Sequence, residues 1–192
     1  VSGIVRIGVG EIAAASCLPL FVENLRNEFP NVSLEIELDL TSRMLQNLQA
    51  GTSDLVFLAG PVAAPDVVTA TIGKVRLLWV CASDALPEVE VDQLPIWSVG
   101  RNSPIFHVMN RWLSRTGRND KPINKCNNLQ TIINIVGRGG GVALLPETMI
   151  NDKLSEGQFV QAFPAPEERI EFQACVRASE SDPLILDVFE RS

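Results

Sequence analysis

Val5-Arg6-Ile7-Gly8-Val9-Gly10 is a short apolar stretch that ends in glycine, and it predicts the first strand of a regular alternation. An amphipathic helix is predicted over 13–30, a strand over 31–39, a helix over 41–51 and a strand over 54–60. Strand–helix alternation of this kind predicts a parallel sheet covered by helices. Ligands of such sheets bind at the carboxyl ends of the strands, beside helix N-termini. The chain is therefore expected to present a small-molecule pocket at that edge.

The hydrophobic pattern supports these elements. Five apolar residues recur at helical spacing in the first helix: Leu18, Phe21, Val22, Leu25 and Phe29. In the following strand, four apolar residues alternate with polar ones: Val32, Leu34, Ile36 and Leu38. One face of this strand is expected to be buried and the other exposed, as in an edge strand. The run Leu55-Val56-Phe57-Leu58 is apolar on both faces, which is typical of a central strand.

The second half of the chain repeats the alternation. Strands are predicted over 75–82, 95–100, 142–145, 159–163 and 170–176, and helices over 104–113, 129–136, 147–154 and 183–189. Ser103 is placed to cap a helix that has Pro104 at its first position. Three consecutive glycines, 139–141, turn the chain into the strand that begins at Val142.

A set of short motifs is spaced along nearly the whole chain. They are Arg6-Ile7-Gly8, Leu18-Pro19, Phe29-Pro30-Asn31-Val32, Thr41, Leu48-Gln49-Ala50-Gly51, Asp54-Leu55 and, much later, the segment 137–146. In this order and at these spacings, they resemble the effector-binding domain of LysR-type transcriptional regulators. The resemblance implies an α/β fold of the type 2 periplasmic-binding-protein kind. Such a fold has two Rossmann-like lobes, joined by two crossover strands, with a ligand cleft between them.

The two runs of alternation predict where the lobes divide. Crossings between lobes are expected near 73–75 and 163–166, so that lobe one comprises residues 1–74 and 166–192 and lobe two comprises 75–165. A two-stranded hinge of this kind can permit closure around a ligand. The chain begins at Val1 rather than at methionine. We expect that the winged helix-turn-helix segment implied by the resemblance is absent from this chain.

Composition and charge restrict the partners of the chain. It has 46% hydrophobic and 20% charged residues, which is ordinary for a globular protein, and its formal net charge is −7. No apolar run approaches the ~20 residues that a membrane span needs. A negative charge argues against DNA binding by this segment, because DNA affinity depends on clustered Lys and Arg. We expect a cytoplasmic protein with no membrane partner, which binds DNA only through its missing N-terminal domain.

The nearest approach to a basic cluster is a group of four residues in the second half: Arg111, Arg115, Arg118 and Lys121. It is interpreted as a solvated helix face and turn, or as an oligomer contact. The four cysteines are far apart and follow no metal spacing: Cys17, Cys81, Cys126 and Cys175. Buried free thiols are expected, and Cys126 is the one placed to react or to touch ligand.

Candidate ligand contacts in the first lobe lie where predicted strands end. The turn formed by Gly10, Glu11, Ile12 and Ala13 offers backbone N–H groups that can hold an anionic oxygen. Members of the family often carry hydroxyl side chains here, and this chain departs from that pattern. Two interpretations of Glu11 are open. It selects a ligand with a cationic or hydrogen-donating group, or it is an exposed first-turn carboxylate favoured by the helix dipole.

Two further candidates lie at the ends of the next strands of lobe one. Thr41 or Ser42 is placed to cap the second helix, which Gly51 can close, and Thr41 is also a candidate ligand contact. Gly60 and Pro61 close the third strand and are expected to form the floor of the cleft.

In lobe two, the resemblance implies that four residues face the cleft: Arg101, Asn102, Ser103 and Ile105. Arg101 suits an acidic ligand, and its alternative interpretation is an exposed loop arginine. Ser103 is also explained by its capping role. Asn127 and Asn128 either cap the next helix or donate hydrogen bonds to the ligand.

The sequence predicts no catalytic site, metal or cofactor. The only histidine, His107, has apolar neighbours and is interpreted as a helix-surface or interface residue. No Gly-x-Ser-x-Gly motif occurs, and Gly8-Val9-Gly10 lacks the third glycine of a dinucleotide turn. Glu35, Glu37 and Asp39 are interpreted as the solvent face of an edge strand rather than as metal ligands.

These observations predict the ligand-sensing and oligomerising domain of a LysR-type regulator. Its effector is expected to be a small polar molecule, an organic acid or an amino-acid-like compound. The apolar stripes of the helices at 18–29 and 106–113 predict self-association as a dimer or tetramer. In the family, comparable helices meet across an antiparallel dimer. The alternative is a solute-binding protein of a transporter with the same fold.

Overall fold

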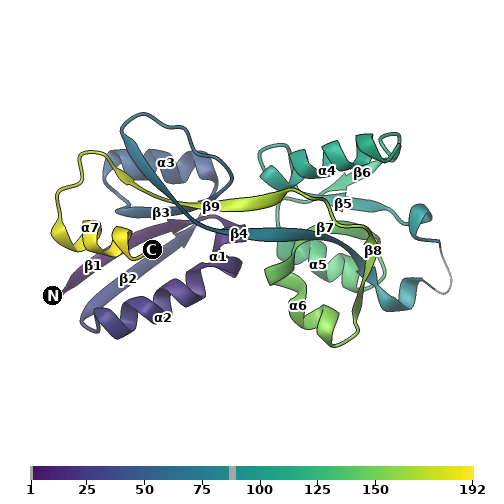
Figure 1. The fold of residues 1–192 in the computed structure, drawn as a ribbon, viewed down its shortest axis with the longest axis horizontal. Helices are drawn as coiled ribbons and strands as arrows, with labels where there is room; N and C mark the ends of the chain where they lie inside the picture. The colour runs from purple at the N-terminus through teal and green to yellow at the C-terminus, as the bar shows by residue number, and fades with distance from the viewer. Residues whose placement is uncertain (1, 87–89) are drawn as a thin grey trace. The chain divides into compact units, whose positions relative to one another are not determined.

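A computed structural model describes residues 2–86 and 90–192, which form two compact units (Figure 1). One unit comprises the chain up to Lys74 together with Glu171–Ser192, and the other comprises Val75–Ile170. The chain passes between the units along strand β4 (Val67–Ala82) and again along β9 (Arg169–Arg177). The second passage thus lies in β9 rather than at 163–166. Val1, where predicted lobe one begins, lies outside the described residues.

Unit 1 contains a mostly parallel sheet with the strand order β2-β1-β3-β9-β4. Its first three strands are β1 (Gly3–Val9), β2 (Val32–Leu38) and β3 (Leu55–Ala59). β1 pairs in parallel with both β2 and β3, as the strand–helix alternation predicts. β9 then pairs antiparallel with β3. The residues Leu55 to Leu58 are fully buried, which agrees with the predicted central position of β3.

Helices cover both faces of this sheet, as Figure 1 shows for α2 and α3. They are α1 (Glu11–Ser16), α2 (Leu18–Glu28), α3 (Thr41–Ala50) and α7 (Pro183–Glu190). On the α2 face, the ring of Phe21 packs edge-on against Phe57 with centroids 4.8 Å apart. On the α3 face, Met44 and Leu48 pack against buried residues of β3 and β9.

The first helix differs from its prediction, since two helices replace the single one expected over 13–30. The chain breaks at Cys17, which lies between α1 and α2. Pro19 occupies the first turn of α2, and proline can neither donate a backbone hydrogen bond nor continue a helix smoothly from the preceding turn. The break therefore follows from Pro19, a residue that is favourable at a helix start.

Strand β2 also differs from its prediction. It lies at the edge of the sheet, as expected, but its apolar residues are not buried along the whole strand. Val32 and Leu34 are half-buried, whereas Ile36 is 40% exposed and Leu38 is 58% exposed. An edge strand has only one neighbouring strand, and here its carboxyl half keeps an apolar face in solvent.

Unit 2 has the strand order β4-β7-β5-β6, with β8 (Phe159–Phe163) beside β4. The other strands are β5 (Ile96–Ser98), β6 (Ile123–Lys125) and β7 (Val142–Pro146), of which β6 and β7 pair in parallel with β5. The short strand β6 was not predicted. It has three residues, two of them exposed, and its pairing with β5 rather than its own pattern defines it.

The helices of unit 2 follow the sequence pattern closely. They are α4 (Pro104–Arg115), α5 (Leu129–Gly137) and α6 (Glu147–Ser155), and short 3-10 turns occur at Ser83–Ala85 and Val91–Gln93. All four residues of the predicted α5 stripe are buried: Leu129, Ile132, Ile133 and Val136. The apolar residues of α4 are buried as well. No helix in the described part of the chain combines the length and apolar character needed to cross a bilayer.

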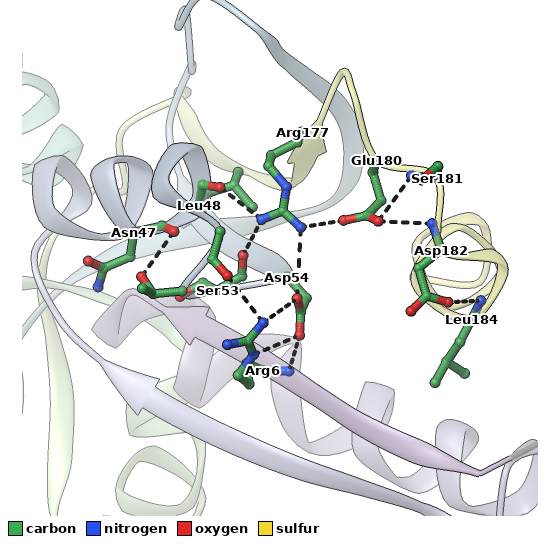
Figure 2. Close-up of polar contacts among 12 residues, drawn as sticks. Arg6, Asn47, Leu48, Ser53, Asp54, Arg177, Glu180, Ser181, Asp182 and Leu184 are labelled. Atoms are coloured by element: carbon green, nitrogen blue, oxygen red, sulfur yellow. Dashed lines mark hydrogen bonds and ion pairs between the residues drawn. The ribbon is translucent and has the colours of Figure 1, made fainter.

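A network of charged side chains ties unit 1 together (Figure 2). The Asp54 carboxylate accepts hydrogen bonds from the backbone N–H of Arg6 at 2.9 Å and from its guanidinium at 3.1 and 3.2 Å. Arg177 donates to the carbonyl oxygens of Leu48 and Ser53. These bonds join β1, the C-terminal end of α3, the start of β3 and the end of β9.

The glycine turn before β7 yields a prediction about stability. Gly141 has φ +150°, and a Cβ on it would lie 2.3 Å from the carbonyl oxygen of Pro95. Gly139 has φ +81° but no heavy atom within 4 Å of such a Cβ. We expect Gly141→Ala to lower the free energy of unfolding by more than about 3 kcal/mol, because backbone must move. Gly139→Ala should cost about 1–2 kcal/mol from backbone strain alone.

Urea unfolding of the two variants beside the unmodified chain measures both values. Equal losses in the two variants would contradict the claim that close approach of Pro95, rather than φ alone, requires glycine at 141.

Candidate functional site

Three candidate positions meet at one edge of unit 1. β1, β2 and β3 are parallel, so their carboxyl ends lie at the same edge of the sheet. Gly10 follows β1, Thr41 follows β2 and Gly60 follows β3. The backbone N–H of Gly10 donates to the carbonyl of Phe57 at 3.0 Å, which holds the first and third of these ends together. The structure therefore brings the predicted lobe-one residues to one place.

The turn after β1 offers backbone groups and one ionisable side chain. Gly10 is the N-cap residue of α1 and has no side chain with which to cap it. Ile12 is 7% exposed and Ala13 is fully buried, so only their backbone atoms are placed to meet a ligand. Glu11 begins α1 and is half-buried. It is the one ionisable side chain of this turn, and it determines the local charge.

Thr41 lies at the N-terminal end of α3, but it does not cap the helix. The cap position is Leu40, and Thr41 is the first helical residue. The Asp39 carboxylate accepts from the backbone N–H of Leu40 at 2.7 Å and pairs with Arg43 at 3.6 Å. The exposed Thr41 hydroxyl makes no hydrogen bond within residues 2–86 and 90–192. The predicted cap is wrong, and the hydroxyl is left available.

Gly60 and Pro61 differ in what they can offer. Gly60 is buried and has φ +88°, and its N–H donates to the carbonyl of Glu171 at 2.7 Å. That bond uses the one donor of Gly60 to join β3 to β9. Pro61 is exposed. At the other end of α3, Gly51 adopts the left-handed conformation, φ +80°, as predicted for a helix C-terminus.

The lobe-two candidates meet at the corresponding edge of unit 2. β5, β6 and β7 are parallel, so the segments after Ser98 and Lys125 lie side by side. The N–H of Cys126 donates to the carbonyl of Ser98 at 2.9 Å and joins these segments directly. Arg101, Asn102 and Asn127 are exposed on them.

Two of the lobe-two candidates are helix caps. The Ser103 hydroxyl accepts from the N–H of Ile105 at 3.3 Å, and the Asn128 side chain accepts from the N–H of Thr131 at 2.8 Å. Both caps were predicted. The side chain of Ile105 is 1% exposed and belongs to the core of unit 2, so only its backbone is near the edge.

The end of β7 lies at the same edge and was not among the predicted site positions. Glu147 and Thr148 begin α6 directly after this strand. Arg76 of β4 approaches the Glu147 carboxylate at 4.0 Å. The available signal was Pro146 followed by an acidic residue, a common start of a helix. Charge at this edge of unit 2 therefore comes from Arg76 and Glu147 as well as from Arg101.

The basic cluster of unit 2 is neutralised by carboxylates. Arg111 and Arg115 both contact Glu168, and the Arg115–Glu168 distance is 2.8 Å. Arg118 and Lys121 both pair with Asp92, and the Arg118 guanidinium also lies over the rings of Trp112 and Phe163. Paired cations of this kind have little capacity to neutralise phosphates. The interpretation as a solvated face fits these contacts.

The remaining polar candidates show no reactive arrangement. Within the described residues, no three His, Cys, Asp or Glu side chains are placed to hold a metal ion. Glu35 and Glu37 are exposed on β2 and, with Arg6, Thr52 and Ser53, line an open depression of about 230 Å³. His107 is exposed on α4.

The thiols differ in burial. Burial raises the pKa of Cys17 to about 11 and that of Cys175 to about 12, which keeps both protonated at neutral pH. Burial also raises the pKa of Cys81. Cys126 is half-buried beside Asn127 and Asn128.

Comparison with known proteins gives one family. A family model described as "LysR substrate binding domain" matches residues 1–191. The HTH-type transcriptional regulator CzcR of Bacillus cereus is 28% identical over 167 residues, which are 87% of this chain and 57% of that protein. GltR of Bacillus subtilis, also an HTH-type transcriptional regulator, is 26% identical over 160 residues, 82% of this chain and 54% of that protein. The chain thus spans just over half the length of these relatives.

Solved structures resemble the whole chain. The regulatory domain of HypT from Salmonella typhimurium in its apo form has a TM-score of 0.83 at 17% identity, covering 97% of this chain and 92% of that one. The reduced form of the OxyR2 regulatory domain from Vibrio vulnificus has a TM-score of 0.80 at 20% identity, covering 100% and 96%. At these identities the likeness shows the fold.

The ion pairs of the basic cluster predict a loss of stability in acid. Partial burial raises the pKa of Glu168, but a backbone hydrogen bond and the nearby Arg115 and Arg111 outweigh it, so the pKa lies below its usual 4.5. A depressed pKa stabilises the fold above the unfolded-state value, and the stabilisation is lost as pH falls through the folded-state value. Near neutral pH, the free energy of unfolding of the Glu168→Gln variant should therefore be about 1 kcal/mol lower than that of the unmodified chain.

Urea unfolding between pH 3 and pH 7 measures this difference, which should shrink on acidification below about pH 4.5. Glu167→Gln is the matched control, because Glu167 is exposed and has no ion pair within the residues that the structure describes. A difference that stays constant with pH would show that the Glu168 charge is not responsible.

Proposed function

Because the chain belongs to the LysR substrate-binding domain family, we propose that it senses a small polar effector for a LysR-type transcriptional regulator. The family is one of transcriptional regulators and not of enzymes. The observation that carries the proposal is the meeting of Gly10, Thr41 and Gly60 at the carboxyl edge of the unit 1 sheet. Ligands of open α/β sheets bind at such edges.

We propose that the effector contacts both sets of candidate residues, which the family resemblance assigns to one ligand. In unit 1 these are Gly10, Glu11, Ile12, Ala13, Thr41, Gly60 and Pro61, and in unit 2 they are Arg101, Asn102, Ser103, Ile105, Asn127 and Asn128. The buried members of both sets contribute backbone atoms. Glu11, Thr41, Arg101 and the exposed amides contribute side chains.

An amino acid or similar zwitterion suits these groups better than a plain organic acid. Arg101 precedes α4 by three residues, and α5 begins after the neighbouring strand β6; helix N-termini together with a guanidinium attract a carboxylate. In unit 1, the Glu11 carboxylate repels an anion and favours a cationic or hydrogen-donating group. A zwitterion satisfies both ends, and we rank it above a simple acid.

The rest of the proposed function concerns the whole protein. The relatives are described as HTH-type regulators, and this chain covers 57% of the length of CzcR. We propose that DNA is bound by an N-terminal winged helix-turn-helix and not by this negatively charged domain, and that the protein is cytoplasmic. Effector binding here then controls DNA binding or transcription by the full-length protein.

We further propose that the domain self-associates through three exposed leucines of unit 1, one on α2, one at the end of β2 and one between β2 and α3. Leu20 is 63% exposed, Leu38 is 58% exposed and Leu40 is 67% exposed. Leu38 and Leu40 are two residues apart in the chain, and exposed apolar surface marks a protein interface where it is contiguous. The stripe of α4 offers less, because its apolar residues are already buried within unit 2. Self-association as a dimer or tetramer therefore depends chiefly on unit 1.

Thr41→Val tests the effector site. Its hydroxyl is exposed and makes no hydrogen bond inside the described structure, so the substitution should leave the free energy of unfolding unchanged within about 0.5 kcal/mol. It should weaken binding of an amino acid or organic acid, identified by a thermal-shift screen, by about 1–3 kcal/mol. Calorimetry on the purified chain measures the affinity.

Thr69→Val is the matched control, since Thr69 is exposed on β4, away from the carboxyl ends of β1–β3. Equal affinities for the unmodified chain and Thr41→Val would place the site away from α3. If binding depends on Thr41 but only plain organic acids bind, the proposal of a zwitterionic effector is wrong.

Leu40→Lys tests the self-association surface. A charge in an apolar contact is costly to bury, so the dissociation constant of the oligomer should rise at least about tenfold. Sedimentation velocity over a concentration series measures it. Leu186→Lys on α7 changes another exposed leucine and should leave association unchanged. A monomeric unmodified chain at high concentration would refute the proposal.

A further inference from the structure

Arg177 joins β9 to the C-terminal end of α3. Its guanidinium donates to the carbonyl of Leu48 at 2.9 Å and to the carbonyl of Ser53 at 2.7 Å. The last carbonyls of a helix have no partners within the helix, and they carry its negative dipole end. A cation bound there fixes the end of the helix. Arg177 therefore completes the C-terminus of α3 from a strand that follows it by more than a hundred residues.

The same guanidinium reaches the segment before α7. Its second nitrogen bonds to the Glu180 carboxylate and lies 3.8 Å from Asp54. The other carboxylate oxygen of Glu180 accepts from the N–H groups of Ser181 and Asp182, both at 3.0 Å. Asp182 in turn caps α7 by accepting from the N–H of Leu184 at 2.9 Å. Figure 2 shows this continuous path from α3 to the N-terminus of α7.

The Arg177–Glu180 link has little access to water, whereas the bonds from Glu180 to Ser181 and Asp182 lie at the surface. The side chain of Glu180 is 8% exposed and that of Arg177 is 18% exposed. Charges with little access to water are costly to leave unpaired, so opening one link disfavours the arrangement of the next. A loosened α3 deprives Arg177 of its acceptor at the Leu48 carbonyl and leaves its contact with Glu180 less well fixed.

We propose that the Arg177–Glu180 pair couples α3 to α7, so that loosening of α3 is transmitted to the N-terminus of α7. α3 has ten residues and spans about 15 Å, with Thr41 at one end and Arg177 at the other. An effector that orders the Thr41 end of α3 then also orders α7. This last step rests on the proposed function, whereas the coupling of the two helices does not.

Native-state hydrogen exchange of the unmodified chain and of Glu180→Gln tests the coupling. The variant keeps an oxygen that can accept from Ser181 and Asp182, but it removes the charge that Arg177 binds. Amides of α7 should exchange at least about tenfold faster, with a smaller change in α3 and β1. Glu190→Gln makes the same change in α7 at an exposed residue without an ion pair in the described structure, and should alter nothing.

A second substitution tests the direction from α3 to α7. Gln46 is exposed in the middle of α3, and glycine there should accelerate exchange of the α3 amides about threefold to fivefold. If the two helices are coupled, Gln46→Gly must also accelerate hydrogen exchange of the α7 amides by a similar factor. In the Glu180→Gln background, Gln46→Gly should accelerate α3 alone.

Three results would overturn the coupling. The first is an α7 that does not respond to Gln46→Gly in the unmodified background. The second is an α7 that responds equally with and without Glu180. The third is an equal acceleration of amide exchange in β1, α3 and α7 of the Glu180→Gln variant, which would mean a general loss of stability in unit 1. Each readout is independent of any effector, so failure here leaves the proposed function standing, and failure to find an effector leaves the coupling standing.

Discussion

The buried carboxylate of Asp54 is the constraint on which the arrangement of unit 1 depends. Its side chain is 9% exposed, and a charge so poorly hydrated persists only when hydrogen bonds replace the lost water. Arg6 supplies three of these bonds, and Arg177 approaches from β9. The middle of β1 and the start of β3 are thereby held in register with the end of β9. Since strands are stiff, fixing them at this edge also fixes the opposite edge, where Gly10, Thr41 and Gly60 lie.

Sequence patterns predicted those parts of the fold that depend on neighbouring residues. The stripe of α5, the cap of α4 by Ser103 and the left-handed Gly51 are all local features, and all agree with the structure. The failures have identifiable causes. The break at Cys17 follows from Pro19 within a stretch whose apolar periodicity continues through it. The strand β6 exists because β5 is beside it, and no pattern within three residues can show that.

The sequence predicted that the candidate positions lie at the carboxyl ends of the strands, but not how the fold uses each side chain. The side chains of Ser103 and Asn128 cap helices, and the side chain of Ile105 is buried in the core. Thr41 or Ser42 was expected to cap α3, but the cap position is Leu40, so Thr41 is the first helical residue and its hydroxyl is not used as a cap. Whether a polar side chain is already used by the fold is decided by distances of less than 3.5 Å, which sequence spacing does not give.

Glu11 sets the charge of the turn that follows β1. A first-turn carboxylate stabilises the N-terminus of a helix, so Glu11 has a structural reason to be present in any protein. α1, however, has only six residues, and the other side chains of its first turn, Ile12 and Ala13, are apolar and buried. The negative charge of Glu11 also weakens the attraction of the backbone N–H groups of this turn for an anionic ligand group. A carboxylate in this turn therefore favours a cationic or hydrogen-donating group in the effector proposed above, and disfavours a plain anion beside α1.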